Sequence, residues 1–473
     1  MNHSKADNNA LPETCRLFSA LTLNHALLEN LASLQFEQMT PIQALSLPQM
    51  LKGQDVIAQA KTGSGKTAAF GLSLLNQLKP NDYSIQGLVL CPTRELAEQV
   101  SQALRRLARC LPNVKILNLS GGMPMRPQQD SLRHGAHVIV GTPWRVQKHL
   151  DKETLSLRKV QTVVLDEADR MLDMGFFDAI ERVLLFCPGK RQTVLFSATY
   201  PAQIKQLASD FMTNPTHVVA DDSEQAIDIE QCFYEVARAQ DKLETLVALL
   251  KKHPSESTLI FCNTKEQTKS LAQSLNEQGF SASALNGDME QIDRDLTMIR
   301  FVNQSCSILV ATDVAARGLD IQALPLVINY DVAFEVDTHT HRIGRTGRAG
   351  NKGLALSISL PNEAERLCQI ETSMTSAMTW GDTKRLSDIK DDIQPPRMVT
   401  MSIAAGKKDK IRPGDVLGAL TKDAGLPADS IGKINITPLY SYVAIDISHA
   451  DKAYQYFKQG KLKGRAVNVR RVG

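Results

Sequence analysis

Short apolar runs, each followed by a stretch of helical periodicity, recur through the first 360 residues. The run at residues 55–58 precedes an apolar-periodic stretch that begins at residue 68, and the run at 163–165 leads directly into carboxylates. Continuous apolar runs of this length are typical of strands that are buried on both faces of a parallel sheet. The pattern therefore predicts alternating strands and helices, an α/β fold class.

This pattern occurs twice. Residues 88–95 (LVLCPTRE) are similar to 259–266 (LIFCNTKE), and residues 138–143 (VIVGTP) parallel 308–313 (ILVATD). Self-similarity over segments of this length indicates duplication of a structural unit. The sequence therefore predicts two α/β domains of one design in tandem.

The composition indicates an ordinary globular protein. The chain has 473 residues, of which 43% are hydrophobic and 22% charged, and a formal net charge of +3. Its eight cysteines include no Cys-x-x-Cys pair, which favours reduced thiols. No apolar run approaches the length needed to span a membrane, so we expect a cytoplasmic protein.

Residues 60–67 predict a phosphate-binding loop between a strand and a helix. Backbone N–H groups can surround a triphosphate only where side chains are absent, and two glycines provide that absence. Lys66 would reach the outer phosphates, and the Thr67 hydroxyl would bind Mg²⁺. The predicted ATP-binding residues of this loop are Ala60, Lys61, Thr62, Gly63, Ser64, Gly65, Lys66 and Thr67.

Two carboxylates end the strand predicted at 163–165. Ligand sites of parallel sheets lie at the carboxyl ends of the strands, which places Asp166 and Glu167 beside the phosphate loop. We expect Asp166 to hold Mg²⁺ through water and Glu167 to act as the general base for the attacking water.

Upstream of the loop, Thr40 and Pro41 predict the start of a helix. Gln43 would then lie in its first turn, where its amide could pair with the donor and acceptor edge of adenine. Phe18 could stack on the base.

The second repeat has no phosphate loop, but residues 338–348 (THTHRIGRTGR) carry arginines spaced by three. Arginines can neutralise the charge that develops on a γ-phosphate during transfer. We expect Arg345 and Arg348 to complete the catalytic site when the two domains close.

Together these strings resemble the DEAD-box ATP-dependent RNA helicases over residues 18–348. The resemblance implies two tandem RecA-like domains, at 18–220 and 221–381, after a flexible tail at 1–17. It also implies that Asp320 binds the nucleotide ribose and that four residues couple hydrolysis to unwinding: Asp169, Ser197, Thr199 and His341. The RNA contacts that it implies are Pro92, Thr93, Arg94, Gly122, Thr142, Arg145, Thr264, Gly287, Arg294, Thr312 and Asp313.

After a polar linker at 382–397, the segment at 398–473 differs in charge from the rest. It holds 13 basic and 6 acidic side chains, a net +7, whereas the remaining chain is −4. Its pattern predicts an α+β domain with the element order of the RNA recognition motif. The predicted elements are strand 399–404, helix 413–425, strands 431–436 and 441–447, helix 450–460 and strand 467–471.

Two tyrosines of this segment, Tyr440 and Tyr442, occupy positions where stacking aromatics are expected. Pro438 and Leu439 replace the usual leading residues, so basic side chains are the better RNA-binding candidates. These are Lys407, Lys408, Arg412, Lys463 and Arg465.

The segment also resembles the C-terminal domain of the DbpA subfamily. That resemblance implies binding to a 23S rRNA hairpin in the pre-50S particle and a role in large ribosomal subunit assembly. An ATP-dependent RNA helicase is the leading hypothesis. A nucleotide-gated RNA clamp and a DNA helicase are the other two.

Overall fold

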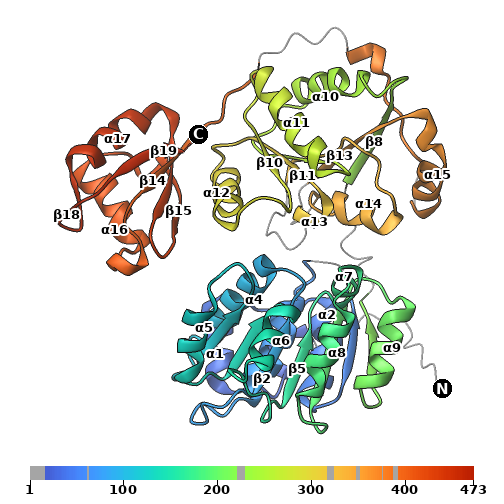
Figure 1. The fold of residues 1–473 in the computed structure, drawn as a ribbon, viewed down its shortest axis with the longest axis vertical. Coiled ribbons are helices and arrows are strands. Elements are labelled where there is room, and N and C mark those ends of the chain that lie inside the picture. Colours follow the sequence, from blue (N-terminus) through green and yellow to red (C-terminus); the bar gives the residue numbers. More distant parts are fainter. Residues whose placement is uncertain are drawn as a thin grey trace. The chain divides into compact units, whose positions relative to one another are not determined.

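The computed structural model describes residues 16–60, 63–220, 229–316, 324–347, 352–374, 377–386 and 393–472. The described residues up to 220 belong to one compact unit and those from 229 onward to a second unit (Figure 1).

The first unit is built on a seven-stranded parallel sheet in the order β3-β4-β2-β5-β6-β1-β7. Its strands are β1 (Val56–Gln59), β2 (Gly87–Leu90), β3 (Ile116–Leu119), β4 (Val138–Gly141), β5 (Thr162–Leu165), β6 (Gln192–Ser197) and β7 (Thr216–Val219). Its α-helices are α1 (His25–Ser33), α2 (Pro41–Leu51), α3 (Lys66–Gln77), α4 (Arg94–Leu107), α5 (Met125–Arg133), α6 (Pro143–Asp151), α7 (Ala168–Asp173), α8 (Phe177–Leu185) and α9 (Ala202–Phe211).

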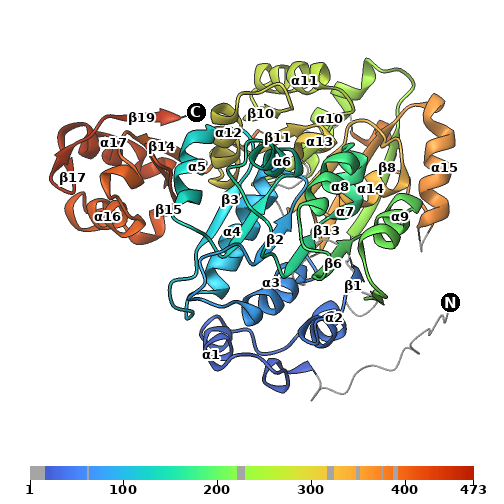
Figure 2. The same cartoon turned by 60° about the horizontal axis from the view of Figure 1, so that its bottom comes forward.

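Helices cover both faces of this sheet (Figure 2). Alternate residues of one strand belong to different core clusters: Val164 packs in one, whereas Val163 and Leu165 pack in the other. This two-sided burial explains why the strands are continuous apolar runs rather than alternating ones.

The second unit contains a six-stranded parallel sheet in the order β10-β11-β9-β12-β13-β8. Its strands are β8 (Ile229–Glu235), β9 (Thr258–Phe261), β10 (Ala282–Leu285), β11 (Ile308–Ala311), β12 (Leu326–Asn329) and β13 (Gly353–Ser359). Its helices are α10 (Asp241–Lys252), α11 (Lys265–Glu277), α12 (Gln291–Val302), α13 (Asp313–Ala316), α14 (Val336–Ile343) and α15 (Ala364–Ser373).

The two parallel sheets share one topology. The order β3-β4-β2-β5-β6 of the first matches β10-β11-β9-β12-β13 of the second, and the repeated strings fall on β2 and β9 and on β4 and β11. The prediction of two α/β domains of one design is confirmed.

A small antiparallel sheet, ordered β15-β16-β14-β19, forms the C-terminal part of the second unit. Its elements are β14 (Met398–Ile403), α16 (Pro413–Gly418), β15 (Ile431–Ile436), β16 (Ser441–Asp446), α17 (Ala450–Gln459) and β19 (Val469–Val472). The predicted α+β order is confirmed, and Val443 and Ile445 of β16 pack with Val416 and Phe457 of the two helices.

Two local features of the C-terminal domain differ from the prediction. The helix expected at 413–425 ends at Gly418 and continues as one π-helical turn, Ala419–Asp423. A hairpin of β17 (Lys461–Leu462) and β18 (Arg465–Ala466) was not predicted; Lys463 and Gly464, both at positive φ, form its two-residue turn. In the first unit, α1 begins at His25, where the Asn24 side chain accepts a hydrogen bond from the Ala26 N–H.

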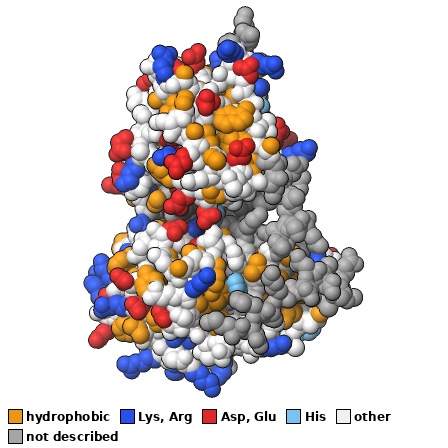
Figure 3. Space-filling model, turned by 90° about the vertical axis from the view of Figure 1, so that its right-hand side faces the viewer, with side chains coloured by type: hydrophobic (Ala, Val, Ile, Leu, Met, Phe, Trp, Pro, Cys, Tyr) orange, Lys and Arg blue, Asp and Glu red, His pale blue; other side chains and the backbone are white. Residues whose placement is uncertain are grey.

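On the face displayed in Figure 3, Lys and Arg side chains are interspersed with Asp and Glu. Within the described ranges, no helix has both the length and the apolar character needed to cross a bilayer.

Candidate active site and nucleic-acid interface

The predicted phosphate loop lies between strand β1, which pairs with β6 and β7, and helix α3. Gly63 and Gly65 have φ values of 90° and 91°, a region that favours glycine. A Cβ on Gly65 would also lie 2.5 Å from Nε2 of Gln43. Lys66 is 6% exposed, and its Nζ donates to the carbonyl of Ala60 at 3.0 Å. Lys66 therefore bonds back to Ala60 at the end of β1.

Gln43 lies in the first turn of α2, and α2 begins at Pro41 as expected. Its Oε1 accepts from the Thr40 N–H at 2.9 Å, and its Nε2 donates to the carbonyl of Gly65 at 3.0 Å. The Thr40 hydroxyl donates to the carbonyl of Ser64 at 2.7 Å. The first turn of α2 is thus tied directly to the phosphate loop, and adenine recognition by Gln43 would exchange these bonds for bonds to the base.

Phe18 is only 3% exposed and packs edge-on against Phe36, with 6.3 Å between the ring centroids. Stacking of Phe18 on a base would require these contacts to rearrange. It stays a prediction.

Asp166 and Glu167 follow β5 and are buried. Burial and the neighbouring charge of Glu167 raise the pKa of Asp166 to about 7, although the charge of Lys66 opposes the shift. Glu167 adopts the left-handed conformation at φ 52° and pairs with Arg170 at 2.9 Å. Backbone strain of this kind is often found at functional sites.

This environment fits a divalent cation. Two buried carboxyl groups that repel each other would be stabilised by a positive ion, and Thr67 at the start of α3 adds a hydroxyl oxygen. No group of three or more His, Cys, Asp or Glu suited to a metal occurs among the described residues. Mg²⁺ commonly binds through one or two carboxylates together with water and phosphate oxygens, which matches this donor set.

Asp169 connects this strand end to the one beside it. Its Oδ2 accepts hydrogen bonds from the backbone N–H groups of Ala198 and Thr199 and from the Thr199 hydroxyl, at 2.9–3.1 Å. Its own N–H donates to the Ser197 hydroxyl at 3.3 Å. Burial alone would raise the pKa of Asp169, but the hydrogen bonds and nearby cations lower it.

Four predicted ligands lie outside the described residues: Lys61, Thr62, Asp320 and Arg348.

The RNA contacts expected in the first unit lie at the carboxyl ends of the adjacent strands β3, β4 and β2. Pro92 and Thr93 follow β2, Gly122 follows β3 and Thr142 follows β4. The residues predicted to bind the nucleotide follow β1 and β5 at the same edge. Thr93 caps α4 by accepting from the Leu96 N–H at 3.2 Å, so its backbone conformation is fixed.

Two arginines shape this part of the edge. Arg94 lies across the backbone of Gly121 and Gly122, and a Cβ at Gly122 would overlap its guanidinium. Arg145 donates to the carbonyl of Met123 at 2.9 Å and to Oε1 of Gln128 at 3.0 Å. Arg145 therefore links α6 to the loop that carries Gly122, in addition to any contact with RNA.

In the second unit, the equivalent strand ends converge on a buried arginine, Arg342 of α14, which is 1% exposed. Its Nε and Nη2 donate to the two carboxylate oxygens of Asp313, each at 2.7 Å. It also donates to Oδ1 of Asn263 at 2.8 Å and to the carbonyl of Asp331 at 2.6 Å. Both oxygens of Asp313, an expected RNA contact, are therefore bound to Arg342.

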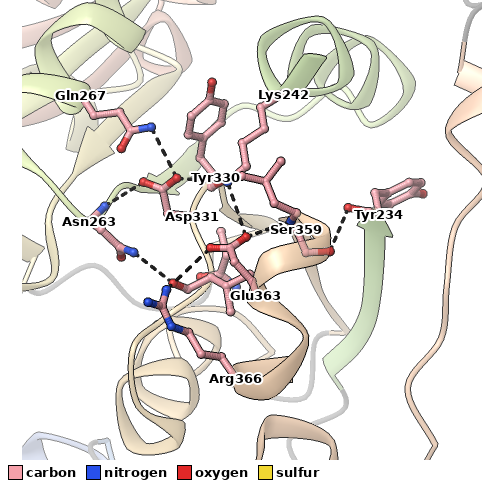
Figure 4. A network of polar contacts seen from close by, with 12 residues as sticks. Tyr234, Lys242, Asn263, Gln267, Tyr330, Asp331, Ser359, Glu363 and Arg366 are labelled. Atoms are coloured by element: carbon pink, nitrogen blue, oxygen red, sulfur yellow. Dashed lines mark hydrogen bonds and ion pairs between the residues drawn. The ribbon is translucent and has the colours of Figure 1, made fainter. Parts of the chain in front are cut away.

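A second buried cation lies next to this cluster (Figure 4). Lys242 of α10 donates to Oδ1 of Asp331 at 3.2 Å and lies 3.8 Å from Oε2 of Glu363. The other oxygen of Asp331 accepts from the backbone N–H of Asn263 at 3.0 Å. Asn263 precedes Thr264, so this network fixes the turn that carries an expected RNA contact.

The remaining predicted contacts of this unit lie on its strand ends or nearby helices. Thr264 is exposed and caps α11, and Gly287 is exposed after β10. Thr312 follows β11 and is 8% exposed. Arg294 of α12 donates to the carbonyl of Ala315 at 2.8 Å, so it is committed in part to the fold.

His341 lies on α14, and Arg345 follows that helix. Arg345 is 5% exposed, and its backbone carbonyl accepts from the Leu324 N–H at 3.0 Å. Because Arg342 anchors α14 to the sheet, it also fixes the backbone that leads to Arg345.

The basic candidates of the C-terminal domain come from two segments that lie side by side. Lys463 of the β17–β18 turn donates to Oδ2 of Asp415 at 3.2 Å, and Arg465 lies 3.5 Å from Asp409. Lys407, Lys408 and Arg412 are exposed on the loop after β14. The fold therefore gathers the predicted basic residues on one surface.

Tyr440 is 38% exposed, whereas Tyr442 on β16 is 7% exposed. On the neighbouring strand, Thr400 bonds to Ser305 at 2.6 Å and to Asn303 at 3.2 Å, in the turn after α12. The sheet face that carries Thr400 is therefore in contact with the rest of its unit, and stacking by Tyr442 has little open surface.

Comparison with known proteins agrees with this geometry. Three family models match: DEAD/DEAH box helicase at residues 40–207, Helicase conserved C-terminal domain at 241–350, and DbpA RNA binding domain at 400–471. The ATP-dependent RNA helicase DbpA of Escherichia coli is 50% identical over 96% of this chain and 99% of its own length. The chain belongs to the DEAD-box ATP-dependent RNA helicases.

Other DEAD-box helicases are similar over about three quarters of this chain. CshA of Bacillus subtilis is 42% identical over 76% of this chain and 73% of its own length. The structure of S. cerevisiae Dbp5 bound to RNA and ADP BeF3 matches with a TM-score of 0.71 and 32% identity, covering 79% of this chain and 99% of that chain. Family membership supports an RNA-dependent ATPase and helicase over the clamp and DNA helicase hypotheses.

Sequence reasoning assigned no role to several residues of this DEAD-box site. Arg342 stood within the arginine run, but its role depends on three strand ends that meet only in the fold. Arg170, the buried partner of Glu167, follows it by three residues, a spacing that brings helical side chains together and could have indicated it. Lys242 carried no such signal.

Proposed function

We propose that the C-terminal domain targets this DEAD-box helicase to 23S rRNA, where it acts during large ribosomal subunit assembly. The observation that carries the proposal is the basic surface formed by the loop at 407–412 and the β17–β18 hairpin. A compact basic surface attached to an RNA-dependent motor would raise the local concentration of the motor at its substrate. The match to a DbpA RNA binding domain supports the same RNA target.

In the proposed mechanism, ATP binding closes the two parallel-sheet domains on one RNA strand, and a short duplex opens locally. Lys66 would bind the outer phosphates, Thr67 and Asp166 would hold Mg²⁺, and Glu167 would accept the proton of the attacking water. The bound Mg²⁺ would neutralise phosphate charge. Arg345 and Arg348 stabilise the transferring phosphoryl group, and hydrolysis releases the strand.

Targeting to 23S rRNA is tested by measuring the ATPase rate of the full chain with saturating 23S rRNA and with generic RNA. Reversing the charge of the exposed basic loop (Lys407→Glu, Lys408→Glu, Arg412→Glu) should abolish the preference for 23S rRNA and leave stimulation by generic RNA. A matched control reverses three exposed lysines on other elements of the same domain, Lys422, Lys433 and Lys458. If both RNAs stimulate the ATPase of the unchanged chain equally, the proposal that it is targeted to 23S rRNA is wrong.

A further inference from the structure

Trp144 is an exposed aromatic residue to which the proposed mechanism gives no role. It is the second residue of α6 and is 55% exposed. Tryptophan is enriched where proteins bind partners, because its ring combines a large apolar face with a polar N–H. The position of Trp144 indicates which partner this is.

The ring is held by its surroundings but is not covered. Phe176 meets it edge-on, with 6.4 Å between the centroids and 89° between the planes. Pro143 restricts the backbone before it, and the carbonyl of Thr142 accepts from the N–H groups of Arg145 and Val146. Arg145 in turn bonds to the loop at Met123. The backbone of Trp144 is therefore fixed and its ring is packed on one side against Phe176, which lowers the cost of ordering the ring when a ligand binds.

The groups beside this ring suit a nucleic-acid backbone. Thr142 and Arg145 flank Trp144 in the sequence, and the Arg145 bond to Met123 brings the loop that carries Gly122 next to α6. Arg94 lies over that loop, and burial together with the charge of Arg94 lowers the pKa of Arg145. Two arginines that repel each other are stabilised by an anion between or beside them. An aromatic face next to such cations is the combination by which proteins hold single strands, with phosphates on the cations and bases on the ring.

We propose that Trp144 stacks on one unpaired base of the RNA strand whose phosphates contact the neighbouring strand ends. The inference rests on the proposed RNA-contact role of Arg94, Gly122, Thr142 and Arg145, to which it adds a contact with a base. Stacking accepts any base, because every base has a π face. It favours RNA whose bases are unpaired and turned away from a duplex stack.

The chain offers a direct optical test because it has only two tryptophans, Trp144 and Trp380. Trp380 packs near Phe233, with 5.9 Å between the centroids, so Trp380→Phe keeps an aromatic ring there and leaves Trp144 as the sole tryptophan. We expect single-stranded RNA to quench the fluorescence of this variant. The same RNA with abasic nucleotides keeps the phosphates and should bind without quenching. Equal quenching by both RNAs would overturn the proposal.

Affinity for the two RNAs gives an independent test in the full chain. Trp144→Leu should weaken binding of intact RNA about tenfold and leave binding of abasic RNA unchanged, whereas Trp144→Phe should retain most of the affinity. A purely structural role would weaken binding of both RNAs alike. If intact RNA binds the unchanged chain, Trp144→Leu and Trp144→Phe equally, the proposal is wrong. The exposed ring would then be a contact for a protein partner instead.

Arg94→Ala in the same assay separates this proposal from the one on which it rests. If Arg94→Ala weakens RNA binding and Trp144→Leu does not, only the stacking role is wrong. If neither substitution weakens binding, the RNA surface of this unit is itself wrong.

Discussion

Asp169 and Thr199 are joined by two hydrogen bonds to one carboxylate oxygen, from the Thr199 backbone N–H at 2.9 Å and from its hydroxyl at 3.1 Å. Asp169 belongs to the helix that follows the proposed base Glu167, and Thr199 follows strand β6. If hydrolysis moves the end of strand β5, which carries Asp166 and Glu167, these hydrogen bonds would transmit the movement directly to Thr199. This contact gives a physical basis for the coupling role proposed for the two residues.

Thr199→Val removes the hydroxyl and keeps the two backbone bonds to Asp169. We expect the free energy of unfolding to fall by about 1.5–3 kcal/mol, the usual net value of a hydrogen bond to a charged group. If the contact couples hydrolysis to unwinding, the number of duplexes displaced per ATP hydrolysed should also fall. Ser209→Ala removes an exposed hydroxyl that bonds within α9 and serves as the control. An unchanged displacement ratio in Thr199→Val would argue against coupling through this bond.

Glu167→Gln should abolish turnover while leaving nucleotide binding nearly intact. The amide can still accept from Arg170, so the buried pair is weakened rather than broken, but an amide cannot take the proton of the attacking water. Phosphate release with saturating RNA should fall at least about 100-fold. Lys66→Ala should instead weaken binding of a fluorescent nucleotide, because it removes a phosphate ligand. Normal turnover in Glu167→Gln would refute the assignment of the base.

The sequence predicted those features that depend on neighbouring residues. The phosphate loop needs two glycines between a strand and a helix, and the duplicated sheet shows as repeated strings; both are local patterns. The sequence could not predict the cluster around Arg342, because its partners Asn263, Asp313 and Asp331 come from three different strand ends. Such contacts arise only once the sheet has assembled.

The C-terminal domain shows the same division. Apolar periodicity predicted its element order, but the burial of Tyr442 depends on contacts such as that of Thr400 with Ser305, a residue nearly a hundred positions away. The β17–β18 hairpin was missed because its strands have two residues each, too few for a periodic pattern.

Arg342→Gln should destabilise the second unit by about 3–5 kcal/mol, because it removes a buried cation and leaves the Asp313 carboxylate, whose side chain is only 22% exposed, without its partner. The change would be measured by urea denaturation of the full chain, followed by far-UV circular dichroism. Arg385→Gln is the matched control: its pair with Asp382 is exposed and should contribute less than about 1 kcal/mol. Equal losses in the two variants would show that burial of the Arg342 pair has no special weight.

His149 should make the first unit sensitive to acid. It is fully buried, with Nε2 3.0 Å from Oε1 of Gln128 and Nδ1 2.8 Å from the Thr154 hydroxyl. Burial, and then the charges of Arg145 and Lys152, lower the pKa of His149 to about 4. The unfolded chain binds this proton more tightly than the folded protein does. The stabilisation that neutral His149 contributes to the fold is therefore complete above about pH 6.5 and is lost as the pH falls toward 4.

At about pH 5 this linkage should cost about 2 kcal/mol of unfolding free energy relative to neutral pH. His149→Gln cannot titrate, so its free energy of unfolding should change less between pH 7.5 and pH 5 than that of the unchanged chain, even if it is lower at both. Urea denaturation of the full chain at the two pH values measures the difference. His25→Gln, at an exposed position of α1, controls for the loss of one histidine. If His149→Gln and His25→Gln lose the same free energy on acidification, His149 is not the group that makes this unit sensitive to acid.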